Sequence, residues 1–208
     1  LHLCNKNMEK MGRTSTTKHD LLAEVCLAAK YEGESLNTYS AQYDAEYSSG
    51  SGFTMCTMLA RSFADIGDIV RGRDLYHGKK KRGQTERDQL EQKLKEIFKE
   101  IHGGLSKKGA QKHYQDNGGN FFQLREDWWT ANRHTVWKAM TCSDDDNKLA
   151  GAHYFRATCD INNEKGPSVA KDHCRCGNDQ PGRDKSKAGN GDVNIVPTYF
   201  DYVPQYLR

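Results

Sequence analysis

The chain has 208 residues, enough for one sizeable core or for two small subdomains that share one. Hydrophobic residues make up 36% and charged residues 28%, and no run approaches the roughly 18 apolar residues of a membrane helix, so we expect a globular domain without membrane insertion. The formal net charge of +3 is too small to indicate nucleic-acid binding by itself, and any polyanion would need a local cluster of basic residues.

The first helix is predicted after an irregular lead-in. Residues 1–16 include the loop sequence "GRTSTT", and from Thr17 apolar residues recur at helical spacing to about Tyr47. The sequence "SSGSG", residues 48–52, ends this helix. The chain begins without methionine and stops within "VPQYLR", so we expect a segment of a longer polypeptide.

A second helix carries the stretch "CTMLARSFADIGDIVRG", residues 56–72. Its apolar residues recur every three or four positions and form one continuous face. Gly67 lies in the middle of this helix, where glycine costs about 1 kcal/mol relative to alanine. It therefore predicts the close approach of a neighbouring helix.

Two further helices follow. Thr85 and Asp88 predict the start of the third, and "GG" at 103–104 predicts its end. The fourth follows "DNGGN" and has Trp128 and Trp137 on its apolar face, where core packing explains them better than ligand stacking. Trp129 has no such clear assignment.

The amino-acid composition changes after Cys142. Residues 143–200 are rich in loop sequences and carry three cysteines, so crosslinks are expected to replace apolar burial there. Another helix is predicted after Pro204. Because alternating strand patterns are absent beyond a few residues, the predicted class is all-α.

The charges of the second helix allow two interpretations. Arg61 with Asp65, and Asp68 with Arg71, have the spacing of structural ion pairs on a helix. Alternatively, Asp65 and Asp68 form a D-x-x-D metal pair, with "DDD" at 144–146 as a second wall. We favour ion pairs and expect no metal, because both aspartates have arginine neighbours and no phosphate-binding glycine loop precedes them.

No other pattern indicates catalysis. Glu126 and Asp127 diverge by about 100° on a helix and cannot act together on one bond. The sequence "HCRC", residues 173–176, with Cys159 upstream, could hold zinc, but its spacing is weak for that and seven cysteines favour disulfides. We expect no enzyme, no catalytic residue and no cofactor.

Seven stretches together resemble a known family. They are "LHLCNKNMEKM", "LLAEVCLAAKYEGESL", "CTMLARSFADIGDIVRGRDLY", "LREDWWTANRHTVWKAMTC", "YFRATC", "CRC" and "DYVPQYLR". Their order and joint occurrence resemble a Duffy-binding-like domain, most closely the alpha class of the erythrocyte membrane protein 1 adhesins of malaria parasites. The resemblance spans residues 1–208.

The resemblance implies a disulfide-stabilised helical bundle with long irregular loops. Residues 1–16 would be the tail of a first subdomain and 17–208 a second, truncated before a third. It also implies display on the extracellular face of the infected erythrocyte and adhesion to erythrocyte receptors or glycans in rosetting. The expected partners are heparan sulfate-like chains, complement receptor one, blood-group sugars and host antibodies.

The resemblance also implies crosslinks. We expect a disulfide between Cys56 and Cys142, and a second between Cys159 and Cys174. Cys4 and Cys176 are expected to reach cysteines outside the segment, while Cys26 has no assigned partner.

A basic loop and the following helix are the candidate glycan site. Clustered cations can bind sulfates through their local field, but acidic neighbours can equally make this an ordinary solvated surface. The candidates are Lys79, Lys80, Lys81, Arg82, Arg87, Lys95 and Lys99.

Two other functions remain alternatives. The same basic cluster, with Tyr76 and His77, would suit a helical nucleic-acid-binding module, which disulfides in the protein would argue against. A metal-dependent helical enzyme would use Asp65 and Asp68.

Overall fold

The computed structural model describes residues 18–47, 52–75, 85–106, 109–116, 118–142, 149–159, 166–177 and 195–208. The helices are α1 (Lys18–Tyr47), α2 (Gly52–Arg71), α3 (Glu86–Gly103), α4 (Ala110–His113) and α5 (Phe122–Met140). Strands β1 (Ala157–Cys159) and β2 (Ser168–Val169) and the 3-10 turns η3 (Phe200–Tyr202) and η4 (Gln205–Leu207) complete it. Within these ranges no helix combines the length and apolar character of a membrane span.

All four predicted main helices are present, and the helical class is confirmed. Thr85 and Asp88 form the expected capping box, in which each side chain accepts a hydrogen bond from the other's backbone N–H. The helix expected after Pro204 is only the short turn η4, and α4 was not predicted. Short elements such as these contain too few periodic residues to be recognised from sequence.

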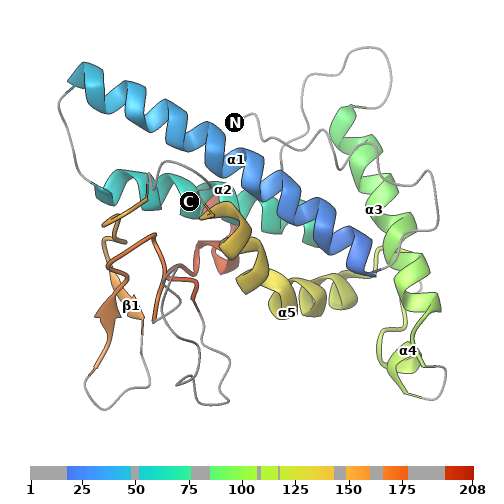
Figure 1. The fold of residues 1–208 in the computed structure, drawn as a ribbon. Helices are drawn as coiled ribbons and strands as arrows, with labels where there is room; N and C mark the ends of the chain where they lie inside the picture. The colour runs from blue at the N-terminus through green and yellow to red at the C-terminus, as the bar shows by residue number, and fades with distance from the viewer. Residues whose placement is uncertain are drawn as a thin grey trace.

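The core lies where α1, α2 and α5 meet. Helix α1 crosses α2 and α5, while α3 packs against α5 on the side of the domain opposite the strands (Figure 1). Trp128 and Trp137 are buried in this core, as predicted, and Trp129 is fully buried as well. The apolar stripes of the helices therefore face one another as the sequence indicates.

Two glycines let helices approach closely. A Cβ atom on Gly67 would lie 2.8 Å from Cζ2 of Trp129, which confirms the close neighbour expected at this position. A Cβ atom on Gly33 would lie 2.1 Å from the carbonyl oxygen of Met140. Both contacts hold α5, against α2 in the first case and against α1 in the second.

Residues 149–159 and 166–177 form the crosslinked region, which is largely irregular. Strands β1 and β2 pair antiparallel, with Ala157 opposite Val169 and a register irregularity before Cys159. This small sheet was not expected, because strands of two and three residues show no measurable alternation. Most of the region depends on disulfides, on backbone hydrogen bonds within the region and on side-chain hydrogen bonds to α5.

Candidate functional site

The charged residues of α2 belong to a buried network rather than to an exposed site. Asp68 accepts a hydrogen bond from Nη2 of Arg71 at 3.0 Å, and the two side chains are 5% and 0% exposed. Arg71 also donates from Nε to the carbonyl oxygen of Gly67. This is the Asp68–Arg71 pair that the helical spacing predicts.

Asp65 has a different partner from the one expected. Its Oδ1 lies 3.3 Å from Nη1 of Arg208, whose Nη2 also contacts Asp68. The expected Arg61–Asp65 pair is therefore wrong: the structure pairs Asp65 with Arg208, and Arg61 is exposed. The spacing identifies neighbours on the helix, but Asp65 faces the C-terminal segment, which lies beside α2 (Figure 1).

Arg208 also bears on the metal hypothesis. One guanidinium contacts both aspartates of the D-x-x-D pair and so stands where a bound cation would stand. Burial raises the pKa of the Asp65 carboxyl above its ordinary value, while the charge of Arg208 opposes this rise. The arrangement supports a structural role for Asp65 and Asp68.

Asp201 is the centre of the network. Its carboxylate accepts two hydrogen bonds from Arg133, at 2.8 and 2.9 Å, and a third from Nε1 of Trp129 at 3.0 Å. The Asp201 side chain is 0% exposed, and Arg71 donates to its backbone carbonyl. Arg71 of α2, with Trp129 and Arg133 of α5, therefore connects these two helices to Asp201 in the turn η3.

Arg125 joins α3 to the end of α2. It makes a two-pronged contact with the carboxylate of Glu91, both bonds 2.8 Å long. It also donates to the carbonyl oxygens of Ile69 and Val70. These belong to the last turn of α2, whose carbonyls have no partner within the helix.

The neighbouring acids of α5 diverge as expected. Glu126 lies 2.8 Å from Nε of Arg73, whereas Asp127 accepts a hydrogen bond from the hydroxyl of Tyr114, also at 2.8 Å. Their carboxylates therefore serve separate contacts and do not form an acid pair.

Both expected disulfide pairings are wrong. Cys56 bonds to Cys174, and Cys159 bonds to Cys176. Cys176 therefore has its partner within the chain, contrary to expectation. Cys142 is exposed just beyond the end of α5, whereas Cys174 is fully buried against α2. Helix ends alone do not indicate which residue of a following loop folds back onto them.

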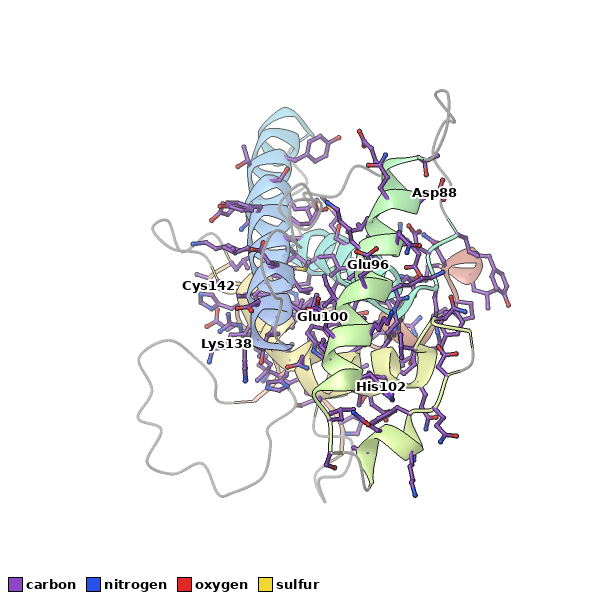
Figure 2. The ribbon with its side chains drawn as sticks, turned by 90° about the vertical axis from the view of Figure 1, so that its right-hand side faces the viewer. Asp88, Glu96, Glu100, His102, Lys138 and Cys142 are labelled. Carbon is purple, nitrogen blue, oxygen red and sulfur yellow. A yellow bond between two sulfur atoms is a disulfide. The ribbon has the colours of Figure 1, made fainter. Side chains whose placement is uncertain are left out.

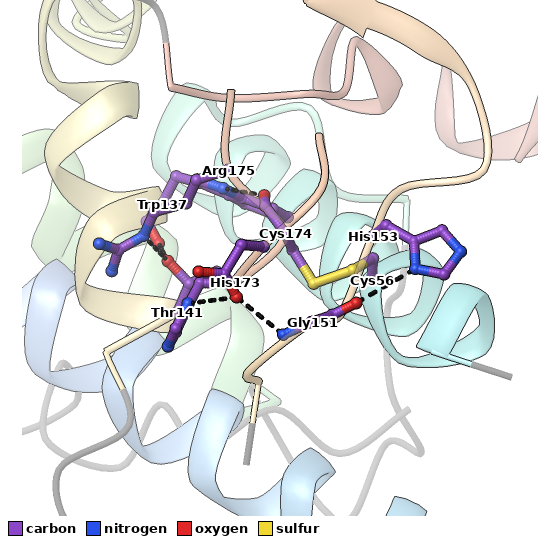
Figure 3. The surroundings of a disulfide bond; sticks show 9 residues. Cys56, Trp137, Thr141, Gly151, His153, His173, Cys174 and Arg175 are labelled. Atoms are coloured by element: carbon purple, nitrogen blue, oxygen red, sulfur yellow. Dashed lines mark hydrogen bonds and ion pairs between the residues drawn. A yellow bond between two sulfur atoms is a disulfide. The ribbon is translucent and has the colours of Figure 1, made fainter. Parts of the chain in front are cut away.

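The surroundings of Cys174 account for the correct pairing (Figure 3). Nε1 of Trp137 donates to the carbonyl oxygen of Cys174 at 3.0 Å. Arg175 donates from Nε to Oγ1 of Thr141 at 2.7 Å. These bonds fasten "HCRC" to α5 and place Cys174 against Cys56. Since both of its cysteines form disulfides, "HCRC" provides no thiolate zinc ligands.

Three of the seven candidate glycan residues lie in the part of the chain that the structure describes. Lys79, Lys80, Lys81 and Arg82 lie outside the described residues. Arg87 pairs with Asp74 at 3.3 Å, and its side chain is 19% exposed. Lys95 is half-buried and Lys99 exposed on α3. Asp88, Glu96 and Glu100 lie along the same helix (Figure 2), so α3 does not present cations alone.

Most residues of the buried network were not predicted from the sequence. The missed residues are Glu91, Arg125, Arg133, Asp201 and Arg208. One pattern could have indicated part of it: Arg125 and Arg133 lie four residues on either side of Trp129, on one face of α5. Two arginines flanking a buried tryptophan call for buried acceptors, although their identity depends on long-range contacts.

Comparisons with known proteins agree with this architecture. The family model described as the Duffy binding domain matches residues 1–208. The NTS-DBL1(alpha-1) domain of Plasmodium falciparum membrane protein 1 (PfEMP1), varO strain, is 37% identical, with a TM-score of 0.70. The match covers 99% of this chain and 40% of that one. No curated protein matches the chain.

Two further solved structures are similar. The varO NTS-DBL1-alpha and CIDR-gamma double domain is 37% identical over 99% of this chain and 25% of that chain, with a TM-score of 0.70. A PfEMP1 DBLb domain bound to human ICAM-1 is 30% identical over 69% of this chain and 32% of that one, with a TM-score of 0.52. The chain thus spans less than half the length of these structures.

The family match settles the class of protein. Duffy-binding-like domains are adhesion domains and not enzymes, so the enzyme alternative is excluded. The two disulfides argue against an intracellular nucleic-acid-binding module. Because the Duffy binding domain model matches residues 1–208, the chain belongs to this family.

Proposed function

We propose that this chain is a host-adhesion domain that binds receptors or glycans on erythrocytes. The observation that carries the proposal is the family match over the whole chain. The chain belongs to the type of domain found in PfEMP1, a membrane protein of the infected erythrocyte surface. Residues 1–16 would form the lead-in and 17–208 the helical subdomain.

The ICAM-1 complex of a related DBLb domain supports a protein receptor as one class of partner. It does not identify the receptor of this chain, because adhesion domains on one fold differ in their surface residues. Complement receptor one and blood-group sugars remain candidates of the proposal.

A sulfated glycan such as heparan sulfate is the other proposed partner. Four consecutive cations, Lys79 to Arg82, can bind sulfates through a local positive field although the net charge is only +3. Lys99 adds an exposed cation on α3. Binding of this kind is electrostatic and weakens with salt.

Heparin affinity tests the glycan proposal. Replacing Lys79, Lys80, Lys81 and Arg82 with serine should weaken heparin binding by about tenfold or more at low salt and reduce its salt dependence. Affinity is measured for both proteins at low and at physiological ionic strength.

A matched variant separates the loop from net charge. Serine at Lys112, Lys138, Arg156 and Lys171 removes the same number of exposed cations elsewhere on the domain. This control should retain most of the affinity. Equal losses in both variants would mean that heparin responds to overall charge, and unchanged affinity in the loop variant would place the glycan site elsewhere.

A further inference from the structure

Helix α1 has two contrasting sides. Its inner side is buried against α2 and α5, with Leu21 and Val25 both fully covered. Its outer side nevertheless exposes two large apolar groups: Leu27 is 41% exposed and Tyr31 is 50% exposed. Isolated exposed apolar residues are ordinary, but these share one side of a single helix.

Two acidic residues complete the outer stripe, which we define as Asp20, Leu27, Tyr31 and Glu34. At 100° per residue these positions fall within about 60° of the helix circumference. Asp20 and Glu34 are both exposed, and the Glu34 side chain is 49% exposed. The stripe therefore combines a tyrosine and a leucine with two carboxylates.

The charge of this side is opposite to that of the chain. A third carboxylate, the half-buried Glu24, lies on the same side of α1, and Lys30 borders it. Lys30 lies 3.8 Å from Glu34, and the two side chains are 34% and 49% exposed, so solvent weakens this ion pair. This acidic side therefore favours basic partners, although the net charge of the whole chain is +3.

We propose that the outer stripe docks a basic surface of a host protein. Tyrosine provides a large amphipathic contact at low conformational cost, and its neighbouring carboxylates complement lysine and arginine on the partner. The same carboxylates repel sulfated glycans, so the stripe and the basic loop would serve different partners. This inference rests on the proposed adhesive function and names a second surface for it.

The test uses human erythrocytes as the probe. The stripe variant combines Asp20→Asn, Tyr31→Ser and Glu34→Gln. The control variant combines Phe122→Ser, Glu96→Gln and Glu100→Gln, which likewise removes one exposed aromatic ring and two exposed carboxylates. Binding of each protein is measured on untreated cells, on trypsin-treated cells and on heparinase-treated cells.

The stripe variant should bind untreated cells about tenfold more weakly than the wild type, and the control about equally. The difference in cell binding between the wild type and the stripe variant measures the binding that depends on the stripe. This difference should disappear on trypsin-treated cells and persist on heparinase-treated cells. On immobilised heparin the stripe variant should elute at no lower salt concentration than the wild type, because negative charge has been removed. Loss of cell binding with retained heparin binding excludes a general folding defect.

Several outcomes would overturn the inference. Equal binding of cells by wild type and stripe variant would do so while leaving the adhesive function intact. If heparinase treatment removed the difference in binding between the wild type and the stripe variant, the partner of the stripe would be a glycan and not a protein. Sedimentation showing a wild-type dimer that the stripe variant cannot form would make a second copy the occupant. Absence of any wild-type binding to erythrocytes would reject the adhesive function together with the stripe.

Discussion

The helical core and the crosslinked region are stabilised in different ways. In the core, α1, α2 and α5 bury apolar stripes, and buried charges such as Asp201 and Arg133 join the C-terminal segment to them. The crosslinked region adds four buried residues to this core, Leu149, Ala152, Tyr154 and Ala170, and is also held by Cys56–Cys174 and Cys159–Cys176. Covalent bonds therefore supplement apolar burial in a region with little regular secondary structure.

The strongest disruption should come from removing the staple between the regions. Replacing Cys56 and Cys174 with alanine should lower the free energy of unfolding by about 4 to 5 kcal/mol, the chain-entropy value for a loop of more than 100 residues. The two cysteines are 118 residues apart. Denaturant unfolding of the oxidised protein measures the change.

Cys26 provides the control for that experiment. Its thiol is in no disulfide, and burial raises its pKa to about 11. Because Cys26 forms no disulfide, Cys26→Ala should lower the free energy of unfolding by less than about 1 kcal/mol. If the double variant were no less stable than this control, the crosslinked region would not depend on its disulfide to α2.

The second effect concerns the charged centre of the core. Asp201→Ala should lower the free energy of unfolding by about 3 to 5 kcal/mol, because Arg133 would be left buried without its carboxylate. Asp127→Ala, at an exposed carboxylate, should cost at most about 1 kcal/mol.

A double-mutant cycle separates charge from packing in this case. Adding Arg133→Ala to Asp201→Ala removes the stranded guanidinium, so the double variant should cost less than the sum of the two single changes. Strict additivity in urea unfolding would contradict the paired role of these residues.

The smallest of the three effects concerns packing between α2 and α5. Gly67→Ala should lower stability by about 1 to 3 kcal/mol despite the better helix propensity of alanine, because the new methyl group would meet the Trp129 ring at 2.8 Å. Gly103→Ala has open space and should be neutral or slightly stabilising. A thermal shift of Gly67→Ala no larger than that control would show that α5 can move aside.

The sequence predicted what local periodicity determines. The helices, the Thr85–Asp88 cap and the close approach at Gly67 all follow from residues within a few turns of one another. The partners of Asp65 and Cys56 could not be predicted in this way, because each lies more than 100 residues away in the chain. Helical spacing offered a nearby arginine for Asp65, and the family resemblance implied Cys142 as the partner of Cys56.

The candidate adhesive surfaces show the same division. Residues 79–82 were identified as a run of four consecutive basic residues, and they lie outside the described residues. The outer stripe was not identified, because helical spacing places Leu27 and Tyr31 on another side of α1 but does not show whether a neighbouring element covers that side. Only the packing of α1 shows which of its apolar residues remain exposed.

The contact between Asp68 and Arg208 spans 140 residues, and this has a consequence for the order of events during synthesis. At about 5 to 20 residues per second, Asp68 of α2 is synthesised roughly 7 to 28 seconds before Arg208, the residue that pairs with it. Cys56 likewise meets Cys26 and Cys142 before Cys174 exists. Oxidation in chain order would therefore favour a non-native bridge, from which the native pairing would form by thiol–disulfide exchange.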